Sequence, residues 1–297
     1  MPPEMPPSLP KIDPARHVLI AGPTASGKSA LALRIAQAQG GIVVNADALQ
    51  VWSCWRVLTA RPDAADEALA PHALYGHVDP GRSYSVGDWL AEVAALLARG
   101  QRLIVVGGTG LYLTSLTRGL AVIPPVPPEI RARGDAWLAE GGLEPMVAAL
   151  DPRTRAGLDL RNPARVQRAW EVLEATGRGL ADWQAETPAP LIGSEDAARL
   201  VLHADRDALA ARIERRFDAM LASGALDEVA AMLHVWDDSA QWARAIGAPE
   251  LAAHLRGELP LAEARERAVV ATRQYAKSQR IWFRNRMRDW ISVAAEG

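Results

Sequence analysis

The sequence of 297 residues lacks several features that would place it in a particular class of protein. Its single cysteine, Cys54, excludes a disulfide framework and any metal site built from several cysteines. No apolar run approaches the ~20 residues that cross a bilayer, and the first residues lack the apolar core of a signal peptide. With 49% hydrophobic and 23% charged residues, most of the chain is predicted to be globular. We expect a monomeric, cytoplasmic protein with no membrane partner.

Lysine is scarce, because only Lys11, Lys28 and Lys277 occur among 33 basic residues, so a lysine inside a motif is informative. The net charge of −2 argues against a nucleic-acid partner. However, residues 265–288 contain eight basic residues against Glu266 alone and also carry aromatic side chains. Such a segment suits RNA, but it also suits a solvated helix whose aromatic side packs on the core. From this segment alone the solvated helix is the better interpretation.

Short apolar runs alternate with helical patterns, which predicts an α/β fold with a parallel sheet covered on both faces. The expected strands are 17–20, 42–44, 103–106 and 200–202, and the clearest helical patterns are 30–39 and 87–99. Proline clusters at 124–128 and 187–190 bound a segment with helical patterns and no strand-like run. We therefore predict a disordered tail over 1–15, a core of the P-loop NTPase type over 16–123 and 191–297 with basic C-terminal helices, and an inserted all-helical lobe over 124–190.

Residues 22–29, Gly-Pro-Thr-Ala-Ser-Gly-Lys-Ser, match the phosphate-loop pattern G-x-x-x-x-G-K-[ST] between an apolar strand and a helix. The alternative is a chance glycine-rich turn, which the flanking strand and helix disfavour. The backbone of this loop would surround a polyphosphate, Lys28 would add a positive charge, and the Ser29 hydroxyl would reach Mg²⁺. The diphosphate-binding residues are then Gly22, Thr24, Ala25, Ser26, Gly27, Lys28 and Ser29.

Three further residues are candidates for the chemistry. Asp47 follows the second expected strand and Thr109 the third, so both belong at the carboxyl edge of the sheet beside the phosphate loop. Either residue could instead serve only a turn or a helix cap. On the expected helix 206–223, Arg216 lies at the edge of the apolar stripe and Arg215 away from it. An arginine beside the core needs an anion, which could be a ligand phosphate or a structural carboxylate.

Together these residues resemble the tRNA dimethylallyltransferase (tRNA isopentenyltransferase) family. The resemblance runs from about His17 to Arg284 and follows the family's order of motifs. Besides the phosphate loop, it is carried by Asp47-Ala-Leu-Gln-Val-Trp52, Thr59-Ala-Arg-Pro62, Val106-Gly-Gly-Thr-Gly-Leu-Tyr112, Asn162-Pro-Ala-Arg-Val-Gln-Arg168-Ala, Arg212-Ile-Glu-Arg-Arg-Phe217 and Thr272-Arg-Gln-Tyr-Ala-Lys277. The departures from the family pattern are Ala48, Trp52, residues 54–58, Ala248, Pro249 and Ser278.

The resemblance implies a reaction in which dimethylallyl diphosphate alkylates N6 of adenosine 37, in the tRNA anticodon stem-loop. Lys28, Ser29 and Mg²⁺ would stabilise the leaving diphosphate with help from Arg216, and Asp47 would take the N6 proton. It further implies RNA contacts at Asp47, Ala48, Leu49, Gln50, Thr109, Arg131, Arg165, Val166, Gln167, Arg168 and Lys277.

Two other functions stay open at this point. A small-molecule or nucleotide kinase would use the same loop for ATP, but it would leave the arginines of the lobe and residues 265–288 without a role. A non-catalytic RNA-binding relative would fit the departures, yet Lys28 and Asp47 are both present. In a prenyltransferase, ATP would at most occupy the loop without reacting.

Overall fold

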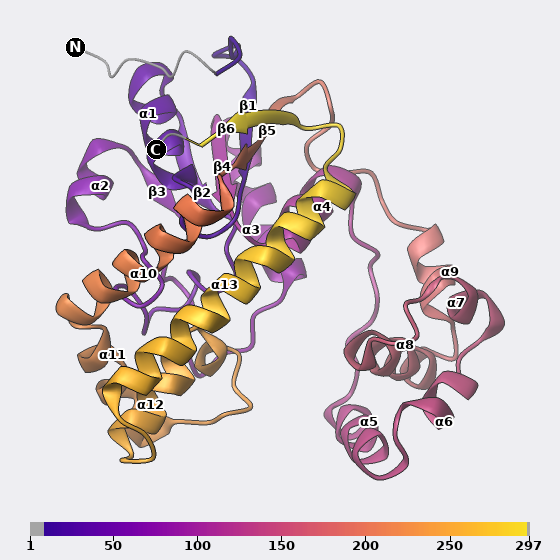
Figure 1. The fold of residues 1–297 in the computed structure, drawn as a ribbon. Helices are drawn as coiled ribbons and strands as arrows, with labels where there is room; N and C mark the ends of the chain where they lie inside the picture. Colours follow the sequence, from indigo (N-terminus) through magenta and orange to yellow (C-terminus); the bar gives the residue numbers. More distant parts are fainter. Residues whose placement is uncertain (1–8, 296–297) are drawn as a thin grey trace. The chain divides into compact units, whose positions relative to one another are not determined.

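The computed structural model describes residues 9–295, and its core is a six-stranded sheet in the order β3-β2-β4-β1-β5-β6 (Figure 1). Every neighbouring pair is parallel. The strands are β1 (His17–Ala21), β2 (Ile42–Asn45), β3 (His72–Ala73), β4 (Leu103–Gly107), β5 (Ala197–His203) and β6 (Ile291–Ala294). The predicted parallel α/β fold is confirmed. Only the two edge strands β3 and β6 were not predicted, because they are two and four residues long and lack a continuous apolar run.

Each face of the sheet packs into its own hydrophobic core. Successive side chains of a strand point to opposite faces, so Val18 and Ile20 of β1 pack with α1 (Lys28–Gln39), whereas Leu19 faces the other way. That second core includes residues of α3 (Val86–Ala98), α10 (Arg206–Ala222) and α13 (Leu261–Arg286). Burial on both faces explains why the strands are continuous apolar runs.

The remaining helices of this unit lie around the same sheet. They are α2 (Ala64–Leu69), α4 (Gly110–Arg118), α11 (Ala225–Met232) and α12 (Ala248–Leu255), with short 3₁₀ turns at Leu233–Val235 and Trp242–Arg244. Helix α10 begins after Asp205, whose side chain accepts hydrogen bonds from the backbone N–H groups of Asp207 and Ala208. None of the helices within residues 9–295 combines the length and the apolar character that crossing a bilayer requires.

The prediction of a disordered tail over 1–15 falls partly on residues 1–8, which lie outside the described residues. For the rest of that segment it is wrong. Ile12 is 5% exposed and packs into the core on the α1 side of the sheet, and its carbonyl accepts a hydrogen bond from Gln39 Nε2 at 3.4 Å. The many prolines in this segment predicted disorder, but burial of the apolar Ile12 side chain stabilises an ordered conformation.

Residues 118–191 form a second compact unit, and residues 1–117 with 192–297 form the first. The predicted boundaries of the lobe were 124 and 190. Throughout residues 118–191, all of them described, the regular structure is helical: α5 (Pro128–Gly141), α6 (Leu143–Ala148), α7 (Pro152–Gly157), α8 (Pro163–Thr176) and α9 (Leu180–Ala185). Three of these helices begin with proline, which is suited to the first helical turn. The unit has its own core around Met146, Trp170 and Val172.

Candidate active site

The phosphate loop joins β1 to α1 with the backbone geometry that its motif requires. Gly27 is left-handed, with φ of 84°, and directly precedes the first turn of α1. A Cβ added to Gly22 would lie 2.7 Å from Ser26 Oγ and 3.2 Å from Leu202 Cβ, so only glycine fits there. The Ser26 hydroxyl is buried without a hydrogen-bond partner in the described structure. The first N–H groups of a helix have no partner within the helix, so those at the start of α1 are available to an anion.

Lys28 is held close to the loop, since its Nζ donates a hydrogen bond to the Pro23 carbonyl at 3.4 Å. Burial lowers the pKa of Lys28 to about 8, against an opposing effect of the nearby Asp47 carboxylate, and the charge of Arg216 lowers it further. A bound diphosphate would favour the charged form of Lys28, because an opposite charge stabilises an ammonium group.

The lowered pKa of Lys28 predicts a pH dependence. In the free enzyme Lys28 is charged below about pH 8 and neutral above it, so kcat/KM for the phosphorylated substrate should fall as the pH rises through that value. The measurement is kcat/KM across a pH series, with Lys28→Arg as the control, because an arginine stays charged and should extend the profile to higher pH. A wild-type profile that stays flat well above this pH would contradict the assignment.

A pocket beside the loop is lined by both polar and apolar side chains, and we call it the inner pocket. Its lining residues are Thr24, Asp47, Leu49, Gln50, Leu58, Thr59, Ile213, Arg216, Phe217, Met220, Ile246, Thr272 and Tyr275. Burial lowers the pKa of Arg216, and the carboxylate of Asp47 opposes that shift. Arg216, placed by the helical wheel at the edge of the apolar stripe, thus lines a pocket that also holds an acid, and its contact with a phosphate stays a prediction.

Asp47 is a turn residue that also lies in the candidate site. Its Oδ1 accepts a hydrogen bond from the Leu49 N–H at 3.0 Å, as a turn residue would, and its own N–H donates to Asn45 Oδ1 at 2.8 Å. It also lines the inner pocket and acts electrostatically on Lys28 and Arg216. The turn therefore fixes the carboxylate in place beside two cations.

The glycine-rich segment after β4 packs closely against neighbouring chain. A Cβ on Gly107 would lie 2.0 Å from the Ala46 carbonyl oxygen, and one on Gly108 would lie 2.2 Å from Gln279 Nε2. Thr109 Oγ1 accepts a hydrogen bond from the Ala48 N–H at 2.9 Å, so this hydroxyl supports the turn that holds Asp47. The expected RNA contact of Thr109 stays a prediction.

Gln279 of α13 was not predicted as a site residue. Its side chain is 4% exposed; Oε1 accepts a hydrogen bond from the Thr24 N–H at 2.9 Å, and Nε2 donates to the Gly108 carbonyl at 2.9 Å. One amide thus ties the phosphate loop to the glycine-rich segment. The only sign of this contact in the sequence is the glycine at position 108, because a side chain there would collide with Gln279.

Glu228 of α11 is the second residue that was missed. Its carboxylate accepts hydrogen bonds from the backbone N–H groups of Arg56, Val57 and Leu58 at 2.8 to 2.9 Å. The Gln50 side chain holds the same segment by donating to the carbonyls of Thr59 and Ala60 at 2.9 and 3.0 Å. Residues 56–58, part of the segment that departs from the family pattern, are therefore held firmly by Glu228. Gln50 also has a structural role, because it holds the backbone of residues 59 and 60.

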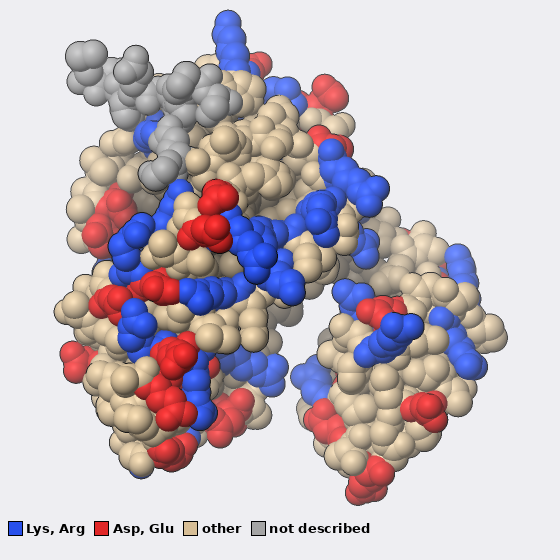
Figure 2. Space-filling view, viewed as in Figure 1, with Lys and Arg blue, Asp and Glu red and all other residues tan. Residues whose placement is uncertain are grey.

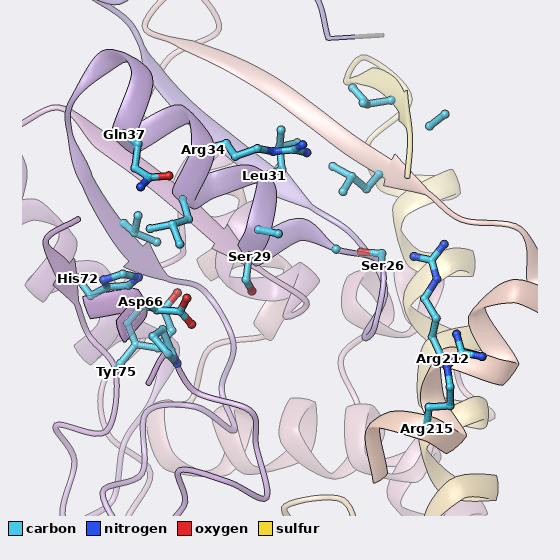
Figure 3. A pocket seen from close by; sticks show the side chains of 18 residues that line it. Ser26, Ser29, Leu31, Arg34, Gln37, Asp66, His72, Tyr75, Arg212 and Arg215 are labelled. Carbon is cyan, nitrogen blue, oxygen red and sulfur yellow. The ribbon is translucent and has the colours of Figure 1, made fainter. Parts of the chain in front are cut away.

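A larger hollow lies on the outer side of the phosphate loop, and we call it the outer hollow (Figure 3). Ser26 and Ser29 line it at the start of α1, Asp66 and Tyr75 line one side, and Arg212 and Arg215 of α10 line the other. Arg215, expected to point away from the apolar stripe, thus faces the loop.

The residues beside the phosphate loop could hold a magnesium ion only if the substrate supplied some of its ligands. Ser29 is exposed at the start of α1, and its hydroxyl is the hard oxygen ligand that Mg²⁺ prefers. No group of three or more His, Cys, Asp or Glu side chains suited to a metal occurs in the described part of the chain. The remaining ligands would be phosphate oxygens and water, as is usual for Mg²⁺.

In residues 118–191, the predicted RNA-contacting residues have unequal exposure. Arg165 lies 3.7 Å from Asp159 and Arg168 lies 3.9 Å from Glu171, and both side chains remain more than two-fifths exposed. Gln167 donates to Asp135 at 2.6 Å and to Glu171 at 3.0 Å. Val166 is fully buried in the core of this unit. An RNA contact by its side chain was therefore a wrong prediction.

Helix α13 carries basic residues of two kinds. Arg265, Arg267 and Arg273 form ion pairs with Asp218, Glu263 and Glu214. Lys277, Arg280 and Arg284 take part in no ion pair among the described residues, and basic side chains gather over this helix (Figure 2). The helix is thus solvated, as its sequence predicts. Lys277, Arg280 and Arg284 provide positive charges in its C-terminal half without a carboxylate partner within residues 9–295.

The fold and the site define a class: a P-loop protein with a pocket of mixed polar and apolar lining beside its phosphate loop. Residues 50–286 match the family model for IPP transferase, and residues 15–70 match that for isopentenyl transferase. The chain is 69% identical over 297 residues to a tRNA dimethylallyltransferase of Paracoccus denitrificans, with 98% of each chain covered. It is 64% identical over 290 residues to one of Dinoroseobacter shibae, with 97% of each covered.

Solved structures agree. A tRNA isopentenylpyrophosphate transferase from Bacillus halodurans superposes with a TM-score of 0.67 and 29% identity, over 95% of this chain and 91% of that one. A eukaryotic dimethylallyltransferase acting on tRNA gives a TM-score of 0.79 and 25% identity, over 94% and 73%. The chain belongs to the tRNA dimethylallyltransferase family. It is a prenyltransferase, and the kinase alternative is wrong.

Proposed function

We propose that this protein transfers a dimethylallyl group from dimethylallyl diphosphate to N6 of adenosine 37 in tRNA, beside the anticodon. One observation carries the proposal: Asp47 and Arg216 share with apolar side chains a single pocket beside the phosphate loop. A base, a cation for the leaving group and a dry wall for the prenyl chain are the three things this reaction needs.

In the proposed reaction a bond forms between N6 and the terminal prenyl carbon, while the bond from that carbon to the diphosphate oxygen breaks. Asp47 takes the proton that N6 loses. Lys28 and Arg216 stabilise the negative charge that develops on the departing diphosphate. Mg²⁺, when bound at Ser29, would neutralise part of the same charge. Gln279 keeps the Thr24 N–H and the loop in register for this step.

The donor is tested directly by supplying tRNA, Mg²⁺ and dimethylallyl diphosphate. We expect a five-carbon unit on one adenosine, detected by mass spectrometry of the nucleosides, and no reaction when ATP replaces the prenyl donor. The control is Lys28→Met, which removes the charge that the diphosphate needs. Wild-type protein that leaves the tRNA unmodified while phosphorylating a small acceptor would overturn the proposal.

Arginines of the second unit and of α13 should contact tRNA phosphates. The double variant Arg165→Ala, Arg168→Ala should weaken tRNA binding and lower the slope of log affinity against log salt by about 1 for each arginine. Binding of the prenyl diphosphate should not change. The measurement is tRNA affinity across a salt series.

The matched control is Arg265→Ala, Arg267→Ala, which removes two arginines of α13 whose ion pairs with Asp218 and Glu263 are much closer than those of Arg165 and Arg168. This variant should keep the wild-type slope. Equal slopes for wild type and the Arg165, Arg168 variant would show that those two arginines only solvate the surface.

A further inference from the structure

We infer that Phe217 and Leu58 form a stop that sets the length of the transferred prenyl group, admitting a five-carbon unit and excluding a ten-carbon one. The inference rests on the proposed function, because it assumes a prenyl diphosphate in the inner pocket. It assigns a role in substrate selection to two apolar side chains that take no part in the bond-breaking step.

The size of the inner pocket is the first observation. Its volume is about 50 Å³. An apolar cavity of about 150 Å³ binds a single benzene ring, so the inner pocket has no room beyond a small prenyl group. A ten-carbon chain is larger than a benzene ring and therefore exceeds this space.

The lining of the pocket indicates what kind of donor it accepts. The pocket is lined by Thr24 of the phosphate loop together with Asp47 and Arg216, and also by the apolar side chains of Leu58, Phe217, Met220 and Ile246. An apolar wall offers no hydrogen bonds to the polar edge of a base, which would be costly to bury there. A prenyl chain loses nothing by the same burial and gains from leaving water.

Backbone packs closely against two of these apolar side chains. A Cβ added to Gly247 would lie 2.9 Å from Phe217 Cε2 and 3.2 Å from Leu58 Cδ1, so the main chain of Gly247 lies close to the Phe217 ring and a Leu58 methyl group. Phe217 is 4% exposed and Leu58 is 3% exposed. Neither side chain can therefore move far toward Gly247 to make room for a longer donor.

The Leu58 wall is also held in place. The Leu58 N–H donates to Glu228 Oε2 at 2.9 Å, and the preceding N–H of Val57 donates to Oε1 of the same carboxylate at 2.8 Å. Hydrogen bonds to an ionised acceptor are stronger than those between neutral groups. The wall therefore resists being pushed aside by a longer donor, which is what a length stop requires.

The test is a competition between dimethylallyl diphosphate and geranyl diphosphate at equal concentrations, with tRNA and Mg²⁺. The readout is the ratio of ten-carbon to five-carbon adenosine by mass spectrometry, which does not depend on how much of a variant is folded. The variants are Phe217→Ala, which removes a ring about as large as one isoprene unit, and Leu58→Ala on the opposite wall. The control is Phe283→Ala, the same deletion at a buried position of α13 that does not line the pocket.

Wild type and the Phe283 variant should prefer the shorter donor by at least ~100-fold, since an apolar pocket rejects added carbons by such factors. In Phe217→Ala or Leu58→Ala the ratio should move toward the longer donor by at least ~10-fold. If both variants form the five-carbon product with the wild-type ratio, the stop does not exist. If wild type forms no prenylated adenosine at all, the proposed function fails instead.

Discussion

Replacing Asp47 with asparagine should lower the single-turnover rate of prenyl transfer by about 10²- to 10⁴-fold, the usual contribution of a positioned base. The lone pair of the adenine N6 amine is delocalised into the ring, so the amine is a poor nucleophile until its proton is removed. Asparagine keeps the shape and can still accept the Leu49 hydrogen bond through its Oδ1, but it cannot take a proton. Binding of tRNA and of the donor should stay within a few-fold of wild type.

A magnesium titration separates the alternatives for Asp47. A residue needed only for the turn would leave the rate of Asp47→Asn nearly intact, because the turn hydrogen bond survives. A residue needed only for the metal would give a deficit that higher Mg²⁺ restores. Either result would remove Asp47 from the role of base. A large deficit that Mg²⁺ does not restore is the expected outcome.

Replacing Arg216 with glutamine should lower kcat for prenyl transfer by about 10²- to 10³-fold, as the loss of one preorganised donor to a developing anion commonly does. Arg216 shares the inner pocket with Asp47, and burial there lowers its pKa. A cation held in such surroundings acts more strongly on the leaving diphosphate than one in water. The measurement is single-turnover kinetics at saturating donor.

The neighbouring arginine is the matched control, because Arg215 lies on the same helix but faces the outer hollow. Arg215→Gln should change kcat by less than ~10-fold. A second readout is the pH profile: the charge of Arg216 lowers the pKa of Lys28, so Arg216→Gln should move the fall in kcat/KM to higher pH. Equal effects of the two substitutions would show that Arg216 acts only through the general charge of α10.

The features of this structure that depend on residues close together in the sequence were predictable. Apolar runs located β1, β2, β4 and β5 because strands buried on both faces have a composition that few other segments share. The phosphate loop was predictable for a related reason, since its glycine positions and its flanking elements are all within one short segment. Arg216 was found by helical periodicity, which also works over a few turns.

The parts that could not be predicted join distant residues. Glu228 reaches the backbone of residues 56–58, and Gln279 reaches Gly108, across at least 170 positions in each case. No spacing rule connects such pairs, because the fold alone brings them together. The burial of Val166 was missed for another reason. The predicted RNA contacts were taken from consecutive residues of a motif, whereas a helix turns every third or fourth residue toward the same face, here toward the core.

The Gln279 bridge makes position 279 intolerant of substitution, although the residue need not touch either substrate. One of its partners is a backbone donor and the other a backbone acceptor. Glutamate offers acceptors only, and leucine offers neither kind of group. Asparagine has the right groups on a side chain one methylene shorter. A library of all amino acids at this position, selected for activity, should therefore return glutamine almost alone, and the same library at the exposed position 278 should return many residues.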